Sequence, residues 1–293
     1  MVLFILFPGF GDTEKYWEYK IEGMETKFGP FKLKKLDFFK KLKKLGKVYT
    51  YTPKINNFKH YSINDTDGIE YYKIRNKLYK KPKKIKLDDI NIDKECKRIY
   101  KIIKDKDEKI IPIGHSIGSW FALHFSNLYP SRCLKVIFLE GAYIDSNNND
   151  FKRIKNNNIK AKEISNKYID LVINRLFKIK KQDIFKYNKE ALKDVNKLFD
   201  ITFNYYYNNI KKELNGKLKV PTISFRNLIF DIEKNVNSKV YNDYNMERID
   251  HDDFIYKKSG NKLTTYYLIN STHHPWRIQR YSDQIINEIK NVI

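Results

Sequence analysis

The segment that most constrains the fold of this chain is Gly-His-Ser-Ile-Gly, residues 114–118. It stands between the apolar run Ile110–Ile113 and a stretch with a helical pattern, Ser119–Leu128. A serine with a glycine two places away on each side suits a very sharp turn from a strand into a helix, because neither glycine brings a Cβ to a point where backbone segments come close. The serine itself would adopt a strained backbone conformation that lifts its hydroxyl clear of the sheet. The sequence therefore predicts a buried strand, a tight turn that presents Ser116, and a helix.

Short apolar runs alternate with helical patterns along most of the chain. Unbroken apolar runs indicate strands covered on both faces of a sheet, and apolar residues at helical spacing indicate helices that pack on it. This alternation favours an α/β fold, with a mostly parallel sheet, right-handed crossovers and helices on both faces. Phe254–Lys257 could pair with the last strand as a hairpin, with Ser259-Gly260-Asn261 as the turn. The expected strands are Val2–Phe7, Lys47–Thr52, Lys109–Ile113, Leu134–Leu139, Val220–Phe225 and Leu263–Ile269, and the expected helices include Leu36–Leu45, Ile92–Ile103, Ser119–Leu128 and Ser282–Val292.

The strand pattern is interrupted between Tyr143 and Lys219. Helical segments with apolar faces lie in this interval, and strands resume only at Val220. A chain of 293 residues suits one large domain with an insertion better than two independent domains. We therefore expect an α/β core of residues 1–142 and 217–293, with a helical insertion, residues 143–216, over one edge of the sheet.

The formal net charge of +23 has two interpretations. It could attract an anionic partner such as nucleic acid, a membrane surface or an acidic substrate. It could also follow from a coding bias, since Lys, Asn, Ile and Tyr are abundant while Ala occurs at only four positions. We favour the bias because the enrichment includes uncharged residues. Nucleic acid is then not an expected partner, whereas weak contact of the basic stretch Lys73–Lys86 with an anionic membrane stays open.

The two cysteines, Cys96 and Cys133, provide no disulfide framework and no metal-ligand spacing, which suits a reducing compartment. The apolar start, Met1–Phe10, is too short to span a bilayer. It also lacks a basic flank before it and a small-residue cleavage site after it. We expect a soluble cytoplasmic protein that holds no metal.

Four motifs resemble the α/β-hydrolase superfamily, and the likeness runs from one end of the chain to the other. Gly114–Gly118 with the helix after it resembles that family's nucleophile elbow, and Phe138–Gly141 resembles the end of its next strand. Phe7–Gly11 resembles its oxyanion loop, with Pro8 at the position where a histidine is usual. His273-His274-Pro275 resembles the His-x-Pro sequence that carries its catalytic histidine.

The resemblance implies a strand order. The family's first two antiparallel strands are absent, because this chain opens directly on what would be the third. In the family's order, strands 2–7 and 109–113 lie side by side, and strand 47–52 lies outside the first of them. The direction of winding therefore reverses between the Phe7–Gly9 loop and the elbow, and open parallel sheets bind ligands at such a crevice.

The resemblance also implies the catalytic roles. Ser116 is the nucleophile, and it needs a general base because a serine hydroxyl is a poor nucleophile at neutral pH. His273 is the expected base, since it follows the last strand at the carboxyl end of the sheet, and His274 is the alternative. His115 should be turned away from the serine, and His124 should be packed or solvated within the elbow helix.

An acid must follow one of the later strands in order to orient the imidazole. Asp231 is placed best, after the strand Val220–Phe225. The alternatives that stay open are Glu233, Asp250 and Asp252 after the same strand, and Glu140 or Asp145 after the preceding one.

The expected oxyanion hole consists of the backbone N–H groups of Phe10 and Ile117. The N–H of Ile117 belongs to the start of the elbow helix, where negative charge is favoured. Gly9 and Gly11 leave room for the acyl group.

These assignments predict a serine hydrolase that cleaves a carboxylic ester or thioester through an acyl-enzyme, with no cofactor or metal. The insertion 143–216 resembles the family's lid, and its large apolar residues favour a medium or long acyl chain. Two alternative functions stay open. One is a catalytically inactive member of the family that binds a ligand, and the other is a basic protein that binds membranes or nucleic acid through its charge.

Overall fold

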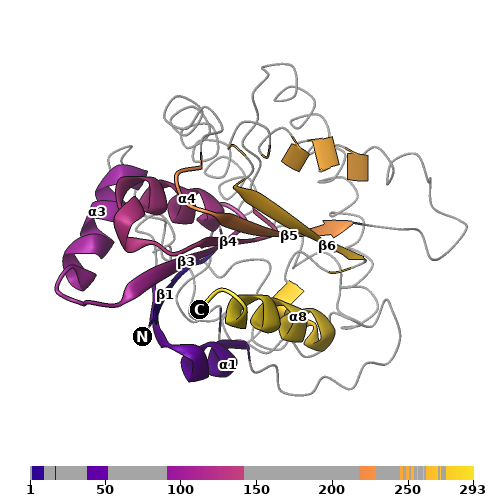
Figure 1. Ribbon diagram of the computed structural model, residues 1–293, viewed down its shortest axis with the longest axis horizontal. Helices are drawn as coiled ribbons and strands as arrows, with labels where there is room; N and C mark the ends of the chain where they lie inside the picture. Colours follow the sequence, from indigo (N-terminus) through magenta and orange to yellow (C-terminus); the bar gives the residue numbers. More distant parts are fainter. Residues whose placement is uncertain are drawn as a thin grey trace, which may run out of the picture. The chain divides into compact units, whose positions relative to one another are not determined.

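The protein is described from a computed structural model (Figure 1). The chain divides into two compact units, one formed by Met1–Tyr143 with Gly216–Ile293 and the other by Ile144–Asn215. The expected helical insertion, residues 143–216, lies outside the described residues. The structure describes residues 2–9, 17, 38–51, 91–141, 218–228, 245–246, 249–250, 252–253, 256, 260, 262–269, 271 and 275–293.

Six parallel strands form the sheet of the first unit. Their order is β2-β1-β3-β4-β5-β6, and every neighbouring pair is parallel. The predicted sheet is confirmed, and within the described residues no antiparallel strand joins it. The observed bounds fall within three residues of the predicted ones. The strands are β1 (Val2–Phe7), β2 (Lys47–Thr50), β3 (Lys109–His115), β4 (Val136–Leu139), β5 (Thr222–Leu228) and β6 (Leu263–Ile269).

Helices cover both faces of the sheet, as predicted. The β1–β2 and β2–β3 connections run in opposite directions along the sheet, so right-handed crossovers send them to opposite faces. Two helices, α3 and α4, accordingly pack on one face, while α1 and α8 pack on the other (Figure 1). The helices are α1 (Phe38–Leu45), α3 (Ile92–Ile103), α4 (Gly118–Leu128) and α8 (Gln279–Lys290), with short 3-10 turns η5 (Pro130–Arg132) and η6 (Pro275–Arg277).

Two helices illustrate how the sequence specifies these elements. The side chain of Asn91 caps α3 by accepting a 2.9 Å hydrogen bond from the N–H of Lys94, and the apolar residues of α3 recur on its buried face. By contrast, α4 is buried almost all round, because it lies between the sheet and α3. It has 11 residues, and none of the helices in the described part of the chain is long and apolar enough to cross a membrane.

The strand side chains that point toward α1 and α8 form a continuous apolar core. Phe4, Ile113 and Phe225 are fully buried there, together with Leu42 of α1 and Ile285 of α8. Burial of each such side chain contributes roughly 1.5–3 kcal/mol. This core holds in place the strands whose carboxyl ends carry the candidate site.

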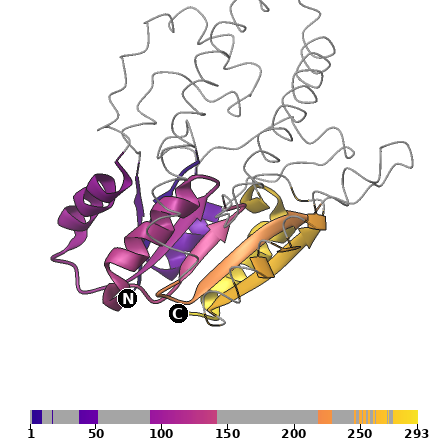
Figure 2. The same ribbon diagram turned by 90° about the horizontal axis from the view of Figure 1, so that it is seen from above.

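The direction of winding reverses between β1 and β3. These strands lie side by side with β2 outside β1, as the resemblance implied. Phe7 is in register with Gly114, so the loop after β1 and the turn after β3 leave the sheet at the same level. Both termini lie together at the opposite edge (Figures 1 and 2). The carboxyl edge between β1 and β3 is where open parallel sheets bind ligands.

The hairpin prediction for Phe254–Lys257 is wrong. Tyr256, the one described residue of that segment, is helical. Within the described part of the sheet, β6 pairs with β5 alone. The turn signal at Ser259-Gly260-Asn261 therefore precedes β6 without producing a pairing of Tyr256 with it.

Candidate active site

A strained serine marks the turn between β3 and α4. Ser116 has a φ of 50°, in the left-handed region, where a non-glycine residue costs about 1–3 kcal/mol. A Cβ on Gly114 would lie 2.4 Å from backbone atoms of Gly118 and Ser119. A Cβ on Gly118 would lie 2.2 Å from the carbonyl oxygen of Phe7. Neither glycine therefore accepts a side chain unless the backbone moves, and the sharp turn predicted from residues 114–118 is present.

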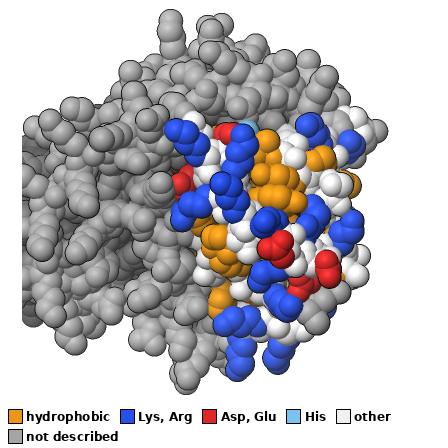
Figure 3. All heavy atoms as spheres, turned by 90° about the vertical axis from the view of Figure 1, so that its left-hand side faces the viewer, with side chains coloured by type: hydrophobic (Ala, Val, Ile, Leu, Met, Phe, Trp, Pro, Cys, Tyr) orange, Lys and Arg blue, Asp and Glu red, His pale blue; other side chains and the backbone are white. Residues whose placement is uncertain are grey.

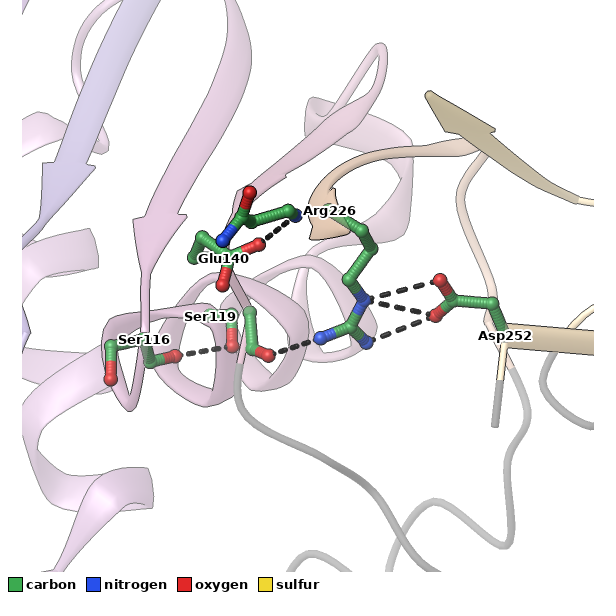
Figure 4. A network of polar contacts seen from close by, with 7 residues as sticks. Ser116, Ser119, Glu140, Arg226 and Asp252 are labelled. Carbon is green, nitrogen blue, oxygen red and sulfur yellow. Dashed lines mark hydrogen bonds and ion pairs between the residues drawn. The ribbon is translucent and has the colours of Figure 1, made fainter. Parts of the chain in front are cut away.

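Hydrogen bonds from two directions hold the backbone of Ser116. Its N–H donates to the carbonyl of Leu139 at 3.2 Å, which ties the turn to the end of β4. Its carbonyl accepts from the N–H of Ser119 at 3.0 Å and from the Ser119 hydroxyl (Figure 4). The side chain of Ser116 is partly exposed and forms no hydrogen bond with another described residue. The backbone is thus fixed while the hydroxyl is left available.

A backbone donor lies next to the serine. Ile117 immediately precedes α4, and its N–H bonds to no other residue in the described ranges. The close approach of Gly118 to the carbonyls of Phe7 and Pro8 brings the end of β1 against this helix start. Of the expected oxyanion loop, Pro8 and Gly9 are buried beside the sheet, while Phe10 and Gly11 lie outside the described residues.

A buried carboxylate follows β4. Glu140 has a φ of 49° and is 3% exposed. Its N–H donates to the carbonyl of Phe225 at 2.9 Å, and its Oε1 accepts from the N–H of Asn227 (Figure 4). Glu140, one of the alternative acids, is thereby held between the carboxyl ends of β4 and β5. It follows Leu139, whose carbonyl accepts the hydrogen bond from the Ser116 N–H.

A buried ion pair lies beyond Glu140 along the same edge. Arg226 Nε is 3.1 and 3.2 Å from the two Asp252 carboxylate oxygens, and its Nη2 is 3.0 Å from Oδ1. Its Nη1 donates to the carbonyl of Gly141. Both side chains are almost fully buried. Burial, followed by the charge of Asp252, raises the pKa of nearby Tyr267 to about 12. Asp252 therefore balances Arg226, which argues against its role as the acid that orients an imidazole.

The described histidines face away from the serine hydroxyl. The ring of His115 is buried against Trp17 and Trp276, so the prediction that it turns away is confirmed. His124 is buried on α4, with Nε2 3.3 Å from Asp93 Oδ1. Burial raises the pKa of Asp93, but hydrogen bonds with Lys97 and His124 outweigh it and hold that pKa below its ordinary value.

Several expected site residues are not among the described ones. Asp250, by contrast, is described and is exposed. Within the described residues, no cluster of His, Cys, Asp and Glu could hold a metal ion. The site candidates that lie outside the described residues are Phe10, Gly11, Asp145, Asp231, Glu233, His273 and His274.

The buried ion pair between Arg226 and Asp252 was not predicted from the sequence, which indicated Asp252 only as an alternative acid. Arg226 stands inside a strand that is otherwise uncharged and buried, and a charge in such a strand requires a buried partner. That signal was available. The sequence could not show that the partner is Asp252, because Asp252 follows Arg226 by 26 residues along the chain.

The chain is similar to known proteins in structure but not detectably in sequence. No family model matches the sequence, and no curated protein matches it. A probable hydrolytic enzyme from Pseudomonas aeruginosa PAO1 is 11% identical with a TM-score of 0.54, over 98% of this chain and 84% of that one. A carboxylesterase from the thaumarchaeon Nitrososphaera gargenis is 12% identical with a TM-score of 0.53, over 99% and 90%. A membrane phospholipase A is 12% identical with a TM-score of 0.54, over 99% and 79%.

These matches span nearly the whole chain, and the described sheet has the strand order and the elbow that the resemblance implied. The chain has the α/β-hydrolase fold. At identities of 11–12%, the likeness establishes the fold and not the activity. Within the α/β-hydrolase fold, Ser116 occupies the elbow, and the carboxyl ends of β4 and β5 form the adjoining edge of the site.

Removal of the Asp252 charge should destabilise the protein. Asp252→Asn leaves Arg226 buried without its counter-charge, and we expect the free energy of unfolding to fall by about 3–5 kcal/mol. An Arg226→Met, Asp252→Leu double variant should recover most of the loss, because it removes both charges together. Urea unfolding followed by circular dichroism measures both, with the exposed Asp250→Asn as control. A loss below about 1 kcal/mol for Asp252→Asn would mean that the pair is not formed.

Proposed function

We propose that the protein is a serine hydrolase that cleaves a carboxylic ester or thioester through an acyl-enzyme. The observation that carries this proposal is the elbow itself. Ser116 is held in a left-handed conformation, and neither its hydroxyl nor the neighbouring N–H of Ile117 bonds to another residue in the described part of the chain. Both lie at the edge of the sheet where the winding reverses, which is the place for a nucleophile in this fold.

The reaction begins when Ser116 Oγ attacks the carbonyl carbon of the substrate while His273 accepts the hydroxyl proton. The N–H groups of Phe10 and Ile117 stabilise the oxyanion of the tetrahedral intermediate, at on the order of 3 kcal/mol for each donor. His273 then donates its proton to the departing alcohol or thiol. Water, activated by the same imidazole, attacks the acyl-enzyme and releases the carboxylic acid. This chemistry requires neither a metal nor a cofactor.

The chain around His273 supports its role as the base. The ring of Trp276 packs on that of His115 with a centroid distance of 4.6 Å. His115 immediately precedes Ser116. Trp276 stands three residues after His273 in the sequence, so the motif that suggests the base is followed by a residue that packs against the neighbour of Ser116.

Two of the structural neighbours support ester hydrolysis as the reaction class. One is named a carboxylesterase and the other a membrane phospholipase A, and both names denote cleavage of carboxylic esters. Because the likeness to them is one of fold, it supports the proposal without identifying the substrate.

The alternative function driven by charge has less support. On the face that carries α3, lysine and arginine side chains predominate over carboxylates and lie among apolar side chains (Figure 3). Lys97 pairs with Asp93 at 2.7 Å, and Arg98 pairs with Glu95 at 3.1 Å. A surface on which basic side chains pair with carboxylates favours weak contact with an anionic membrane. It does not favour tight binding of nucleic acid.

Covalent labelling tests the nucleophile. A fluorophosphonate probe should label the wild type, and Ser116→Ala should abolish labelling because it removes the proposed nucleophile. His273→Ala should slow labelling and ester hydrolysis by about 10²–10⁴-fold through loss of the general base. Ser126→Ala, which changes a buried serine of α4, the helix that follows Ser116, is the control and should label normally. An unlabelled wild type would favour the ligand-binding alternative instead.

A pair of variants separates the candidate acids. We propose Asp231, which follows the end of β5 by three residues. Asp231→Asn should lower kcat by on the order of 10⁴-fold with little change in KM, because the imidazole loses the partner that holds its tautomer. Glu140→Gln should chiefly lower the free energy of unfolding, since Asn227 then loses a charged acceptor. The opposite ranking of the two kcat values would assign the acid role to Glu140.

The length of the acyl chain is the testable part of the substrate class. We propose a medium or long chain, and each CH₂ that becomes buried contributes about 0.8 kcal/mol. For nitrophenyl esters from acetate to palmitate, kcat/KM should therefore rise by roughly tenfold for each two carbons until the pocket is filled. A profile that is flat across lengths, or highest for acetate, would contradict a lipid-like substrate.

A further inference from the structure

The hydroxyl of Ser119 bonds back onto the backbone of the elbow. It donates to the carbonyl of Ser116, which also accepts the N–H of Ser119 at 3.0 Å (Figure 4). Ser119 is 1% exposed, so its hydroxyl has little access to water. One residue of the first turn of α4 thus ties the Ser116 carbonyl twice, once through its backbone and once through its side chain.

The carbonyl of Ser116 and the N–H of Ile117 belong to one peptide group. That group is planar and trans, so its C=O and N–H point in opposite directions and turn together. A bond that fixes the carbonyl therefore also fixes the direction of the Ile117 N–H, which is a proposed oxyanion donor. Hydrogen bonds to the carbonyl also polarise the peptide group, which strengthens its N–H as a donor.

The conformation of Ser116 explains why this peptide group needs the extra bond. A non-glycine residue with a φ of 50° persists only where its surroundings hold it there. The Leu139 carbonyl holds the N–H side of Ser116, at 3.2 Å. On the carbonyl side, Ser119 supplies both of the hydrogen bonds that the structure shows. Loss of the hydroxyl therefore removes one of the restraints against rotation of the peptide group between Ser116 and Ile117.

The side chain of Ser119 is itself confined by the residue that follows Glu140. A Cβ on Gly141 would lie 3.1 Å from the Oγ of Ser119 and 3.2 Å from its Cβ, so this backbone comes close to the serine side chain. The carbonyl of Gly141 accepts from Arg226 Nη1, and Arg226 is paired with Asp252 (Figure 4). The buried ion pair thus restrains the backbone that confines the Ser119 hydroxyl.

We propose that Ser119 is a positioning residue that orients the Ile117 N–H toward the oxyanion. This proposal rests on the proposed function. Ser119 acts through the peptide group between Ser116 and Ile117, and its own hydroxyl is used in the bond to the backbone. Removal of a whole oxyanion-hole donor lowers kcat by about 10²–10³-fold. Ser119→Ala keeps the donor but holds it less firmly, so the expected loss in kcat is smaller, about 10-fold.

Ser126 provides a matched control within the same helix. Serine hydroxyls in helices often bond to a carbonyl of the preceding turn, and such a bond is by itself ordinary. The hydroxyl of Ser126 donates to the carbonyl of Leu123 at 2.8 Å, and Ser126 is also 1% exposed. Its acceptor lies outside the elbow. Comparison of Ser119→Ala with Ser126→Ala therefore separates the loss of a buried hydroxyl bond from the loss of donor orientation.

Four measurements on each variant test the proposal. They are kcat and KM on a nitrophenyl ester, the dependence of kcat/KM on pH, the urea midpoint and the inhibition constant of a trifluoromethyl ketone. The ketone forms a tetrahedral adduct with a nucleophilic serine, and the oxyanion of that adduct needs the same donors as the transition state. The pH dependence reports the pKa of the free enzyme's base, which the proposal leaves unchanged.

We expect Ser119→Ala to lower kcat by about 10-fold, with KM changed by less than about threefold. The inhibition constant of the ketone should rise by about the same factor as kcat falls, and the acidic limb of the pH profile should stay in place. Ser126→Ala should lower the urea midpoint by a similar amount and leave kcat and the ketone affinity within about twofold of the wild type.

Gly141→Ala is a second, independent variant. Its methyl group would meet the Ser119 Oγ at 3.1 Å, so the hydroxyl must shift by a few tenths of an ångström while it is still present. We expect kcat and the ketone affinity to fall by about threefold to tenfold. In the Ser119→Ala background the same change should have less than about a twofold effect, because the hydroxyl that it displaces is gone. This variant decides the question if Ser119→Ala does not fold.

The outcomes distinguish this proposal from the proposed function. If the wild type hydrolyses esters but Ser119→Ala keeps kcat and the ketone affinity as Ser126→Ala does, the positioning role is overturned. It is also overturned if kcat falls while the ketone affinity is unchanged, or if the acidic limb moves, since the base is then affected instead. If the wild type neither hydrolyses esters nor reacts with a fluorophosphonate, the proposed function fails and the positioning role fails with it.

Discussion

The close approach of the elbow to the end of β1 is the contact on which the rest of the candidate site depends. A Cβ on Gly118 would lie 2.2 Å from the carbonyl of Phe7 and 2.4 Å from that of Pro8, so the helix start and the strand end touch backbone to backbone. This contact places the N–H of Ile117 beside the loop that carries Pro8 and Gly9. An oxyanion hole built from backbone donors needs these two segments together, since each supplies one N–H.

The carboxyl ends of β4 and β5 add a second constraint, which is electrostatic. Glu140 is anchored by the N–H of Asn227, and Arg226 is neutralised by Asp252 while it donates to the carbonyl of Gly141. Charges at this depth are tolerated only when they are paired or bonded to the backbone. The network therefore ties the carboxyl ends of β4 and β5 to each other and to Asp252.

Much of the fold was predictable, because strand and helix patterns are local. The bounds of β1 and β6 match their predictions, as do those of α3, since unbroken apolar runs and a capped apolar stripe specify these elements without help from distant residues. Prediction failed at Tyr256, where a turn signal suggested a hairpin and the chain is helical. It was also incomplete at the acid, where Asp252 was an open alternative until its pairing with Arg226 was seen.

The sequence alone determined the elbow. Gly114 and Gly118 permit a turn that residues with a side chain at those two positions could not form unless the backbone moved, and the reason is steric and local: a Cβ at either glycine would collide with backbone. Tertiary structure alone decided which side chains meet. It paired Arg226 with Asp252 and turned His115 into the core against Trp17 and Trp276. These contacts join residues far apart in the chain, and burial and ring packing select such partners only after the sheet has brought them together.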